Sequence, residues 1–229
     1  MTPEPPSPAS ESASHAGSRR VPYQCSKPSG WFGRLILRNM NKRHSGVTDW
    51  GLSHVSVNAS DVILDVGCGG GRTIAKLASK ASKGKVYGVD HSDASLAVAN
   101  KTNAAQITAG QVEIRSGSVS QLPYPDGMFD LITAVETHFF WPNLPGDVRE
   151  VVRVLKPGGV FTIIAEIYKG APTTVARACE KYAPKTGMTL LTPDEHRDLL
   201  VSAGLGEVEV FTWPEKGWLC ARGKRSFAV

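Results

Sequence analysis

From residue 61 onward, short apolar runs alternate with segments whose apolar residues recur every three or four positions. A continuous run such as VILDV at 62–66 is typical of a strand buried on both faces, and the three-to-four recurrence is typical of a helix. The alternation predicts a doubly wound, Rossmann-like α/β domain with a mostly parallel sheet and right-handed crossovers. Strands are predicted at 62–66, 85–89, 112–115, 129–135 and 160–165, and helices at about 72–82, 92–105 and 148–155.

The C-terminal part of the chain departs from this alternation. A helix is predicted at 193–203, closed by Gly204, and two extended runs follow at 207–213 and 218–222. Only a short turn separates these runs, and such a connection requires an antiparallel pair.

The first 60 residues follow a third pattern. Residues 1–22 are rich in Pro and Ser and nearly free of large apolar groups, so we expect a disordered tail. Apolar residues at helical spacing predict a helix at 31–40 and a second short one around 47–54. The expected organisation is therefore the tail at 1–22, a helical lid region at 23–60 and the α/β domain at 61–229, with a substrate-side insertion at 166–192.

Composition narrows the class of protein. The net charge is +5, but the basic residues are scattered, so we expect no nucleic-acid partner. No apolar run approaches the length of a membrane span, and no signal peptide precedes the first predicted helix. The four cysteines are far apart and form no C-x-x-C pair, so we expect no metal site or disulfide framework and a reducing, cytoplasmic location.

The segment DVGCGGGR at 65–72 joins the first predicted strand to the first predicted helix of the domain. Glycines at such a turn allow a tight bend and let a ligand approach the backbone without meeting a Cβ. Glycine-rich turns also serve simple packing. The position after the first buried strand, together with Asp90 after the second, favours a nucleotide-type ligand.

Three residues bear on which ligand this is. The dinucleotide pattern G-x-G-x-x-G that starts at Gly67 requires glycine at 72, where Arg72 stands. Asp65 would repel a pyrophosphate, whereas the ammonium and sulfonium of S-adenosylmethionine (SAM) favour a nearby acid. Asp90 is placed to accept hydrogen bonds from both ribose hydroxyls.

These motifs resemble those of the class I SAM-dependent methyltransferases. The resemblance rests on D-x-G-C-G-x-G at 65–71, on V-D at 89–90, on the segment GSVSQLPYPDGMFD at 117–130 and on RVLKPGG at 153–159. Together they point to the UbiE-like branch, whose members methylate diverse small molecules. The resemblance implies seven strands in the order 3-2-1-4-5-7-6, with strand 7 antiparallel. It also implies methyl transfer from SAM to an O, N, C or S atom of a small-molecule acceptor, leaving S-adenosylhomocysteine (SAH), in a monomer or homodimer.

The resemblance also implies residue roles. The methionine end of the cofactor falls to Asp65, Gly67, Cys68 and Gly69, the ribose to Asp90, and the adenine to His91, Ser92, Gly117, Ser118 and Val119. The sequence departs from the family at 118, where a serine replaces the usual acid. A hydroxyl can still bond the exocyclic amine, but more weakly than a carboxylate.

The acceptor is expected at the carboxyl end of the fourth strand. His138 is a candidate general base, or it only hydrogen-bonds substrate, cofactor or backbone. Glu136 is a candidate for catalysis or for cofactor contact. Phe139 and Trp141 either form an apolar substrate wall or pack beneath a lid, and Trp50 either belongs to a lid or packs in the core. Glu166 and Tyr168, after the fifth strand, are further candidate substrate contacts.

The sequence leaves three other functions open. An NAD-dependent oxidoreductase is disfavoured by Asp65 and Arg72. A non-catalytic protein that keeps the SAM or SAH pocket for regulation or structure is kept open by Ser118. An RNA or protein methyltransferase is disfavoured because no N-P-P-Y-type signature follows the fourth strand.

Overall fold

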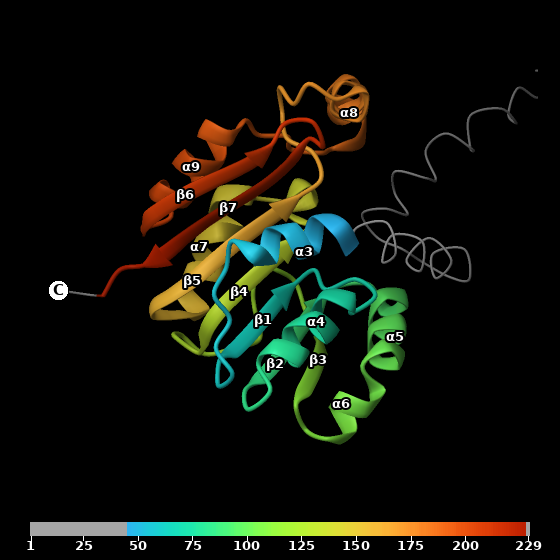
Figure 1. The fold of residues 1–229 in the computed structure, drawn as a ribbon, viewed down its shortest axis with the longest axis vertical. Coiled ribbons are helices and arrows are strands. Elements are labelled where there is room, and N and C mark those ends of the chain that lie inside the picture. Colours follow the sequence, from blue (N-terminus) through green and yellow to red (C-terminus); the bar gives the residue numbers. More distant parts are fainter. Residues whose placement is uncertain (1–44, 228–229) are drawn as a thin grey trace, which may run out of the picture.

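The structure, a computed structural model, describes residues 45–227 (Figure 1). The tail predicted for 1–22 and the helix predicted at 31–40 lie outside these residues, as does most of the lid region at 23–60. Within the described residues, no helix has the length and apolar character that crossing a bilayer requires.

Seven strands form one sheet in the order β3-β2-β1-β4-β5-β7-β6. The neighbours from β3 to β5 pair in parallel, and β7 runs antiparallel to both β5 and β6. The predicted fold class, strand order and antiparallel C-terminal pair are thus confirmed. The strands are β1 (Val62–Val66), β2 (Lys85–Asp90), β3 (Val112–Ser116), β4 (Phe129–Val135), β5 (Leu155–Ala165), β6 (Leu205–Trp213) and β7 (Trp218–Arg225).

Helices cover both faces of the sheet (Figure 1). Along β1 the buried side chains alternate, so that Ile63 packs with helices α3, α4 and α5, whereas Leu64 packs with α7 and α9. Each face therefore has its own apolar core. The helices are α3 (Ser45–Ser53), α4 (Arg72–Lys80), α5 (Asp93–Thr102), α6 (Ala104–Thr108), α7 (Leu144–Val154), α8 (Thr174–Thr186) and α9 (Pro193–Ser202), with a 3₁₀ turn η1 (His138–Phe140).

The helix predicted at 92–105 is two helices, α5 and α6. The break lies at Asn103, a fully buried residue whose Nδ2 donates to the carbonyl oxygens of Gly71 at 3.0 Å and Ala99 at 2.9 Å. A tertiary contact with the glycine turn therefore ends α5 there.

Two other elements differ from the prediction. Strand β5 begins at Leu155, because Leu155 pairs with Phe129 across an irregularity before Val160 pairs with Leu131. Helix α8 occupies the middle of the predicted insertion. Its N-terminus is capped by Thr173, whose hydroxyl accepts from the Ala176 N–H at 3.1 Å. Pro184 lies in its last turn and has no N–H to donate to the carbonyl oxygen of Glu180, four residues earlier.

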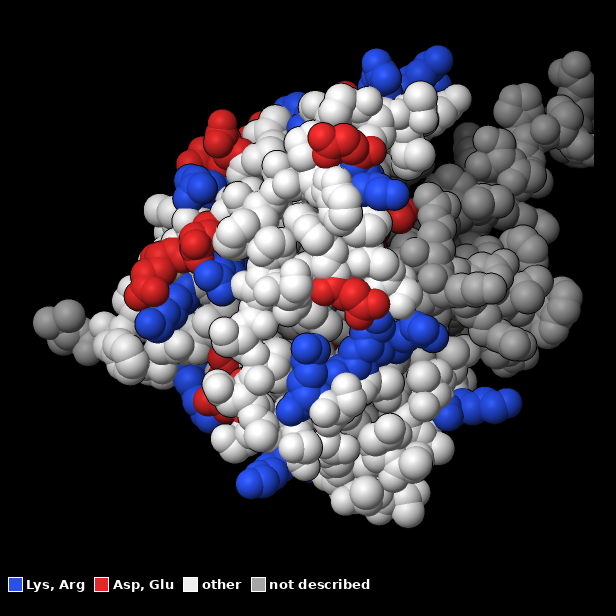
Figure 2. Space-filling view, in the orientation of Figure 1, with Lys and Arg blue, Asp and Glu red and all other residues white. Residues whose placement is uncertain are grey.

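On the face shown in Figure 2, most acidic side chains lie beside basic ones. A short row of basic side chains lies over α4, where Lys76 pairs with Asp49 of α3. The net charge of +5 is therefore not gathered into one broad basic surface on this face.

Candidate functional site

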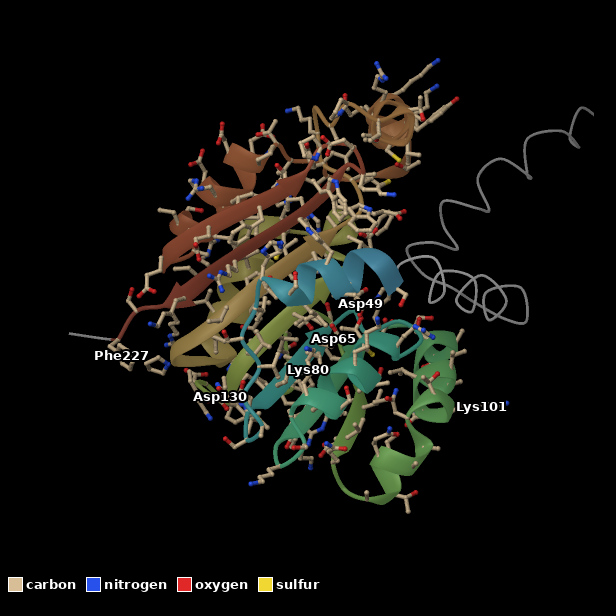
Figure 3. All side chains as sticks on the ribbon, viewed as in Figure 1. Asp49, Asp65, Lys80, Lys101, Asp130 and Phe227 are labelled. Atoms are coloured by element: carbon tan, nitrogen blue, oxygen red, sulfur yellow. The ribbon has the colours of Figure 1, made fainter. Side chains whose placement is uncertain are left out.

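The winding of the sheet reverses between β1 and β4, which are neighbours although the chain leaves β1 toward β2. In open α/β sheets, ligands bind outside the carboxyl ends of the strands at such a reversal. Asp65 lies near the end of β1, Asp90 ends β2, and Glu136 directly follows β4. Figure 3 shows Asp65 toward this end of the strands and Asp130 toward the opposite end.

The turn from β1 to α4 bends through glycines with positive φ, at 68° for Gly67, 53° for Gly69 and 75° for Gly71. The N–H groups of Gly67 and Cys68 both donate to the carbonyl oxygen of Val89, at 2.8 and 3.1 Å. A Cβ at Gly67 would lie 2.1 Å from Thr137 Oγ1. The turn is thus held against β2 on one side and against the loop after β4 on the other.

Asp90 is held by the turn that it faces. Its Oδ2 accepts from the Gly69 N–H at 2.9 Å, and its Oδ1 accepts from the Ser92 N–H at 2.8 Å. Each carboxylate oxygen has a second lone pair, so both can still accept a hydroxyl. Asp90 is a fixed acceptor suited to a vicinal diol.

Asp65 is buried, and its Oδ1 accepts a 2.6 Å hydrogen bond from the Thr133 hydroxyl. Burial raises the pKa of this carboxyl from 3.8 to about 7, the Thr133 hydrogen bond opposes the rise, and the charge on Asp90 adds to it. A cation beside Asp65 would stabilise its charged form. The end of β1 is therefore suited to a cationic group.

Three predicted cofactor contacts surround these acids. Cys68 is buried, and burial raises the pKa of its thiol, so the group is neutral. His91 is exposed, with Nδ1 3.9 Å from Asp90 Oδ1. Ser92 is buried and caps α5, because its hydroxyl accepts from the Ser95 N–H at 3.3 Å.

The loop after β3 begins against Asp90, since the Gly117 N–H donates to the Asp90 carbonyl oxygen at 3.1 Å. Ser118 is exposed, and its hydroxyl accepts from the Ser120 N–H at 3.2 Å. Val119 is half-buried. The structure thus brings Gly117, the first of these three predicted residues, to the end of the second strand.

Glu136 has a φ of 59°, which is uncommon for a residue with a Cβ. Its N–H donates to the Ile164 carbonyl oxygen at 2.9 Å, and its Oε1 accepts from the Glu166 N–H. Strained backbone of this kind persists where the surroundings fix it and is frequent at functional sites. Glu136 ties the end of β4 to the end of β5.

His138 is fully buried, and its Nε2 lies 3.1 Å from Nε2 of His196 in α9. Nδ1 of His196 lies 2.8 Å from the Thr192 carbonyl oxygen, which can only accept, so Nδ1 carries the hydrogen. His196 Nε2 is then the acceptor and His138 Nε2 the donor. His138 Nδ1 has a lone pair without a partner in the described part of the chain. Burial lowers the pKa of both rings, so both are neutral at pH 7.

The aromatic candidates take part in packing. Phe139 and Trp141 lie in the core on the α7 face, and the Trp141 ring stacks on Phe161 at 6.4 Å between centroids. Tyr168 is buried in the same core. Trp50 lies on α3, with its ring centroid 6.0 Å from that of Trp218 in β7. These contacts agree with the packing alternatives for Phe139, Trp141 and Trp50 and leave their contact with a substrate as a prediction.

Comparisons with known proteins agree with this geometry. Residues 64–163 match the family model described as a methyltransferase domain. Methyltransferase GfsG of Streptomyces halstedii is 33% identical over 158 residues, covering 68% of this chain and 56% of that protein. The demethylmenaquinone methyltransferase of Symbiobacterium thermophilum is 39% identical over 102 residues, covering 44% of this chain and 41% of the relative. A solved SAM-dependent methyltransferase from Aquifex aeolicus superposes with a TM-score of 0.66 at 19% identity, over 83% of this chain and 96% of that one.

Residues 64–163 form a methyltransferase domain of the class I SAM-dependent kind. The family predicted from the motifs is thereby confirmed. The chain spans about half the length of the curated relatives that it matches, 56% and 41% for the two described here.

Three residues of the candidate site were not predicted from the sequence. Thr133 is a polar residue inside the apolar run FDLITAV, a signal that could have been noticed. Thr137, the neighbour of Gly67, and His196, the partner of His138, gave no such signal. Only the folded chain brings His196 to a residue 58 positions away.

Proposed function

We propose that this chain binds S-adenosylmethionine across the turn at 65–71 and transfers its methyl group to a small-molecule acceptor. The observation that carries the proposal is the pair of buried carboxyl groups, Asp65 and Asp90, on adjacent strands at the reversal of the sheet. Asp90 suits the ribose diol, and Asp65 suits a cation. A pyrophosphate beside this turn would meet repulsion from ionised Asp65, which disfavours NAD as the ligand.

The residues fit the cofactor in the following way. Asp90 holds the ribose, and the loop that begins at Gly117 lies beside the attached adenine, with His91 and Ser118 at its edges. Asp65 faces the ammonium of the methionine end, where Gly67 and Gly69 let the ligand approach the backbone. When bound, SAM supplies a methyl group on a sulfonium, which is already a good leaving group.

The protein has to align the acceptor with this methyl group and exclude water. Glu136 and Glu166 fix the ends of β4 and β5, where the acceptor would lie. In the buried His138–His196 pair, Nδ1 of His138 carries the open lone pair. This nitrogen is the candidate to take a proton from the acceptor. Phe139, Trp141 and Tyr168 form an apolar layer behind this region. The relative named demethylmenaquinone methyltransferase supports a small molecule as the acceptor.

Calorimetry with SAH and with NADH tests the binding half of the proposal. Wild-type protein should bind SAH and not NADH, and binding of NADH alone would overturn the assignment. Asp90→Ala should abolish detectable SAH binding because the ribose loses its acceptor. Since this change also removes the acceptor for the Gly69 and Ser92 N–H groups, a melting curve must show that the variant is folded at the titration temperature.

Turnover of methyl-labelled SAM over a broad panel of metabolites tests the catalytic half. Transfer of label to any small acceptor supports an enzyme. SAH binding without turnover across the panel would favour the non-catalytic alternative.

A further inference from the structure

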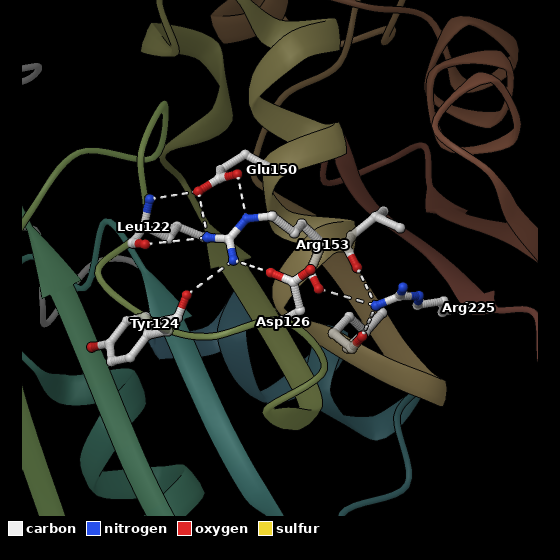
Figure 4. Close-up of polar contacts among 8 residues, drawn as sticks. Leu122, Tyr124, Asp126, Glu150, Arg153 and Arg225 are labelled. Carbon is white, nitrogen blue, oxygen red and sulfur yellow. Dashed lines mark hydrogen bonds and ion pairs between the residues drawn. The ribbon is translucent and has the colours of Figure 1, made fainter.

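The loop at 117–126, which joins β3 to β4, is fastened by side chains of α7 (Figure 4). Asp147 Oδ1 accepts from the Ser120 hydroxyl at 2.7 Å, and Glu150 Oε1 accepts from the Leu122 N–H at 2.8 Å. Asp147 and Glu150 are three residues apart, so they lie on one side of the helix. α7 thus holds the first half of the loop by carboxylates.

Arg153, one turn further along α7, holds the second half. Its guanidinium donates to the carbonyl oxygens of Leu122 at 3.3 Å and Tyr124 at 3.0 Å, and to Asp126 Oδ1 at 2.6 Å. It also pairs with both oxygens of Glu150 at 2.8 Å, which orients the fork (Figure 4). A planar fork with five fixed donors can make all of these bonds at once, whereas a lysine ammonium cannot.

The other end of the same loop touches the candidate cofactor site. The Gly117 N–H donates to the Asp90 carbonyl oxygen, and a Cβ on Gly117 would lie 2.9 Å from Val89 Cγ2 and 3.2 Å from Pro123 Cδ. Pro123 stands between Leu122 and Tyr124, the two residues whose carbonyl oxygens Arg153 binds. A shift of the loop at Arg153 therefore reaches the backbone of Asp90 through Pro123 and Gly117.

We propose that Glu150 and Arg153 are positioning residues for the nucleoside end of the cofactor. They contact no part of the site directly, and they act by fixing the loop at 117–126 before the ligand arrives, so that binding does not have to order it. This inference rests on the proposed function, since it takes the ligand beside Asp90 to be an adenosine derivative.

Arg153→Lys is the principal test, and Arg225→Lys is its matched control. Arg225 also binds α7, where its Nη1 donates to the carbonyl oxygens of Val152 and Arg153 at 3.0 Å, and its third hydrogen bond goes to the carbonyl oxygen of Leu155 at the start of β5 rather than to the loop at 117–126. Both variants keep the charge and lose the fork. Ser120→Ala, at an exposed position, removes one loop fastening with little risk to folding.

The measurements are SAH and adenosine affinities by calorimetry and amide hydrogen exchange of the loop. Arg153→Lys should weaken the binding of SAH and of adenosine by the same factor, about tenfold or more. A factor of this size corresponds to the loss of one charge-assisted hydrogen bond. Its loop amides should exchange faster without ligand and recover with SAH. Ser120→Ala should change these quantities in the same direction but less, and Arg225→Lys should lower the melting temperature with SAH affinity unchanged.

The outcomes separate the inference from the proposed function. Failure of the wild-type protein to bind SAH would overturn the proposed function and this inference with it. Wild-type binding together with unchanged affinity in Arg153→Lys and Ser120→Ala would overturn the inference alone. Equal losses in Arg153→Lys and Arg225→Lys would overturn it too, because they would show a general effect of loosening α7.

Discussion

Replacing Asp65 by Asn should stabilise the protein at neutral pH and lower its affinity for the cofactor. The folded-state pKa of Asp65 is about 7, and its ordinary value is 3.8. Between these values the folded state holds a proton that the unfolded state has released, so the wild-type protein loses stability as pH rises. The free energy of unfolding falls by about 1.4 kcal/mol for each pH unit in this range, and the total loss at pH 8 reaches about 4 kcal/mol.

The assay is urea unfolding of wild type and Asp65→Asn at a series of pH values in the same buffers. The difference between the two free energies of unfolding removes the contribution of every other titrating group. Between pH 5 and pH 8 it should move by about 2.5 kcal/mol in favour of the variant, because most of this interval lies below the folded pKa. Thr133→Val removes the hydrogen bond that lowers the pKa of Asp65 and should displace the transition to higher pH.

Cofactor binding gives a second readout with the opposite sign. If the ammonium of SAH requires ionised Asp65, wild-type affinity for SAH should fall by about a hundredfold from pH 8 to pH 5. The reason is that only about one hundredth of the protein still has Asp65 ionised at pH 5. The Asn variant should bind weakly at both pH values. If the difference in unfolding free energy between wild type and Asp65→Asn does not change with pH, burial does not raise the pKa of Asp65 and the reasoning is refuted.

Two further predictions concern the turn and the buried histidines. Gly67→Ala should destabilise the protein by more than the cost of positive φ alone, about 1–2 kcal/mol, because the new Cβ meets Thr137. The measurement is urea unfolding, and the control is Gly110→Ala, at a φ of 75° with open space around it. Equal losses of stability in the two variants would contradict the contact with Thr137. The pKa of both His138 and His196 is lowered in the fold, so below pH 6.5 the unfolded state takes up protons that the folded state does not. Each histidine should therefore lower the free energy of unfolding by up to about 1.4 kcal/mol for each pH unit below 6.5. His196→Gln should reduce this acid slope, and a slope equal to that of wild type between pH 5 and 6.5 would count against burial of the neutral pair.

The sequence by itself determined the architecture and the first half of the site. The apolar runs placed β1 and β4 at their observed bounds, because strands buried on both faces leave continuous apolar segments. Asp65, the glycines and Asp90 could be found because they lie at fixed distances from those strands along the chain. The antiparallel C-terminal pair followed from the short connection between its two runs.

Only the tertiary structure decided what depends on contacts between distant segments. Three contacts join residues between 27 and 58 positions apart, so no local pattern encodes them. They are the contact of Asn103 with Gly71 at the end of α5, the pairing of His138 with His196, and the bonds from Arg153 to the loop at 117–126. The ionisation of Asp65 is decided in the same way. Its acid is visible in the sequence, but its pKa of about 7 comes from burial, from Thr133 and from Asp90 on neighbouring strands. Desolvation and charge coupling depend on distances in space, which the order of residues alone does not contain.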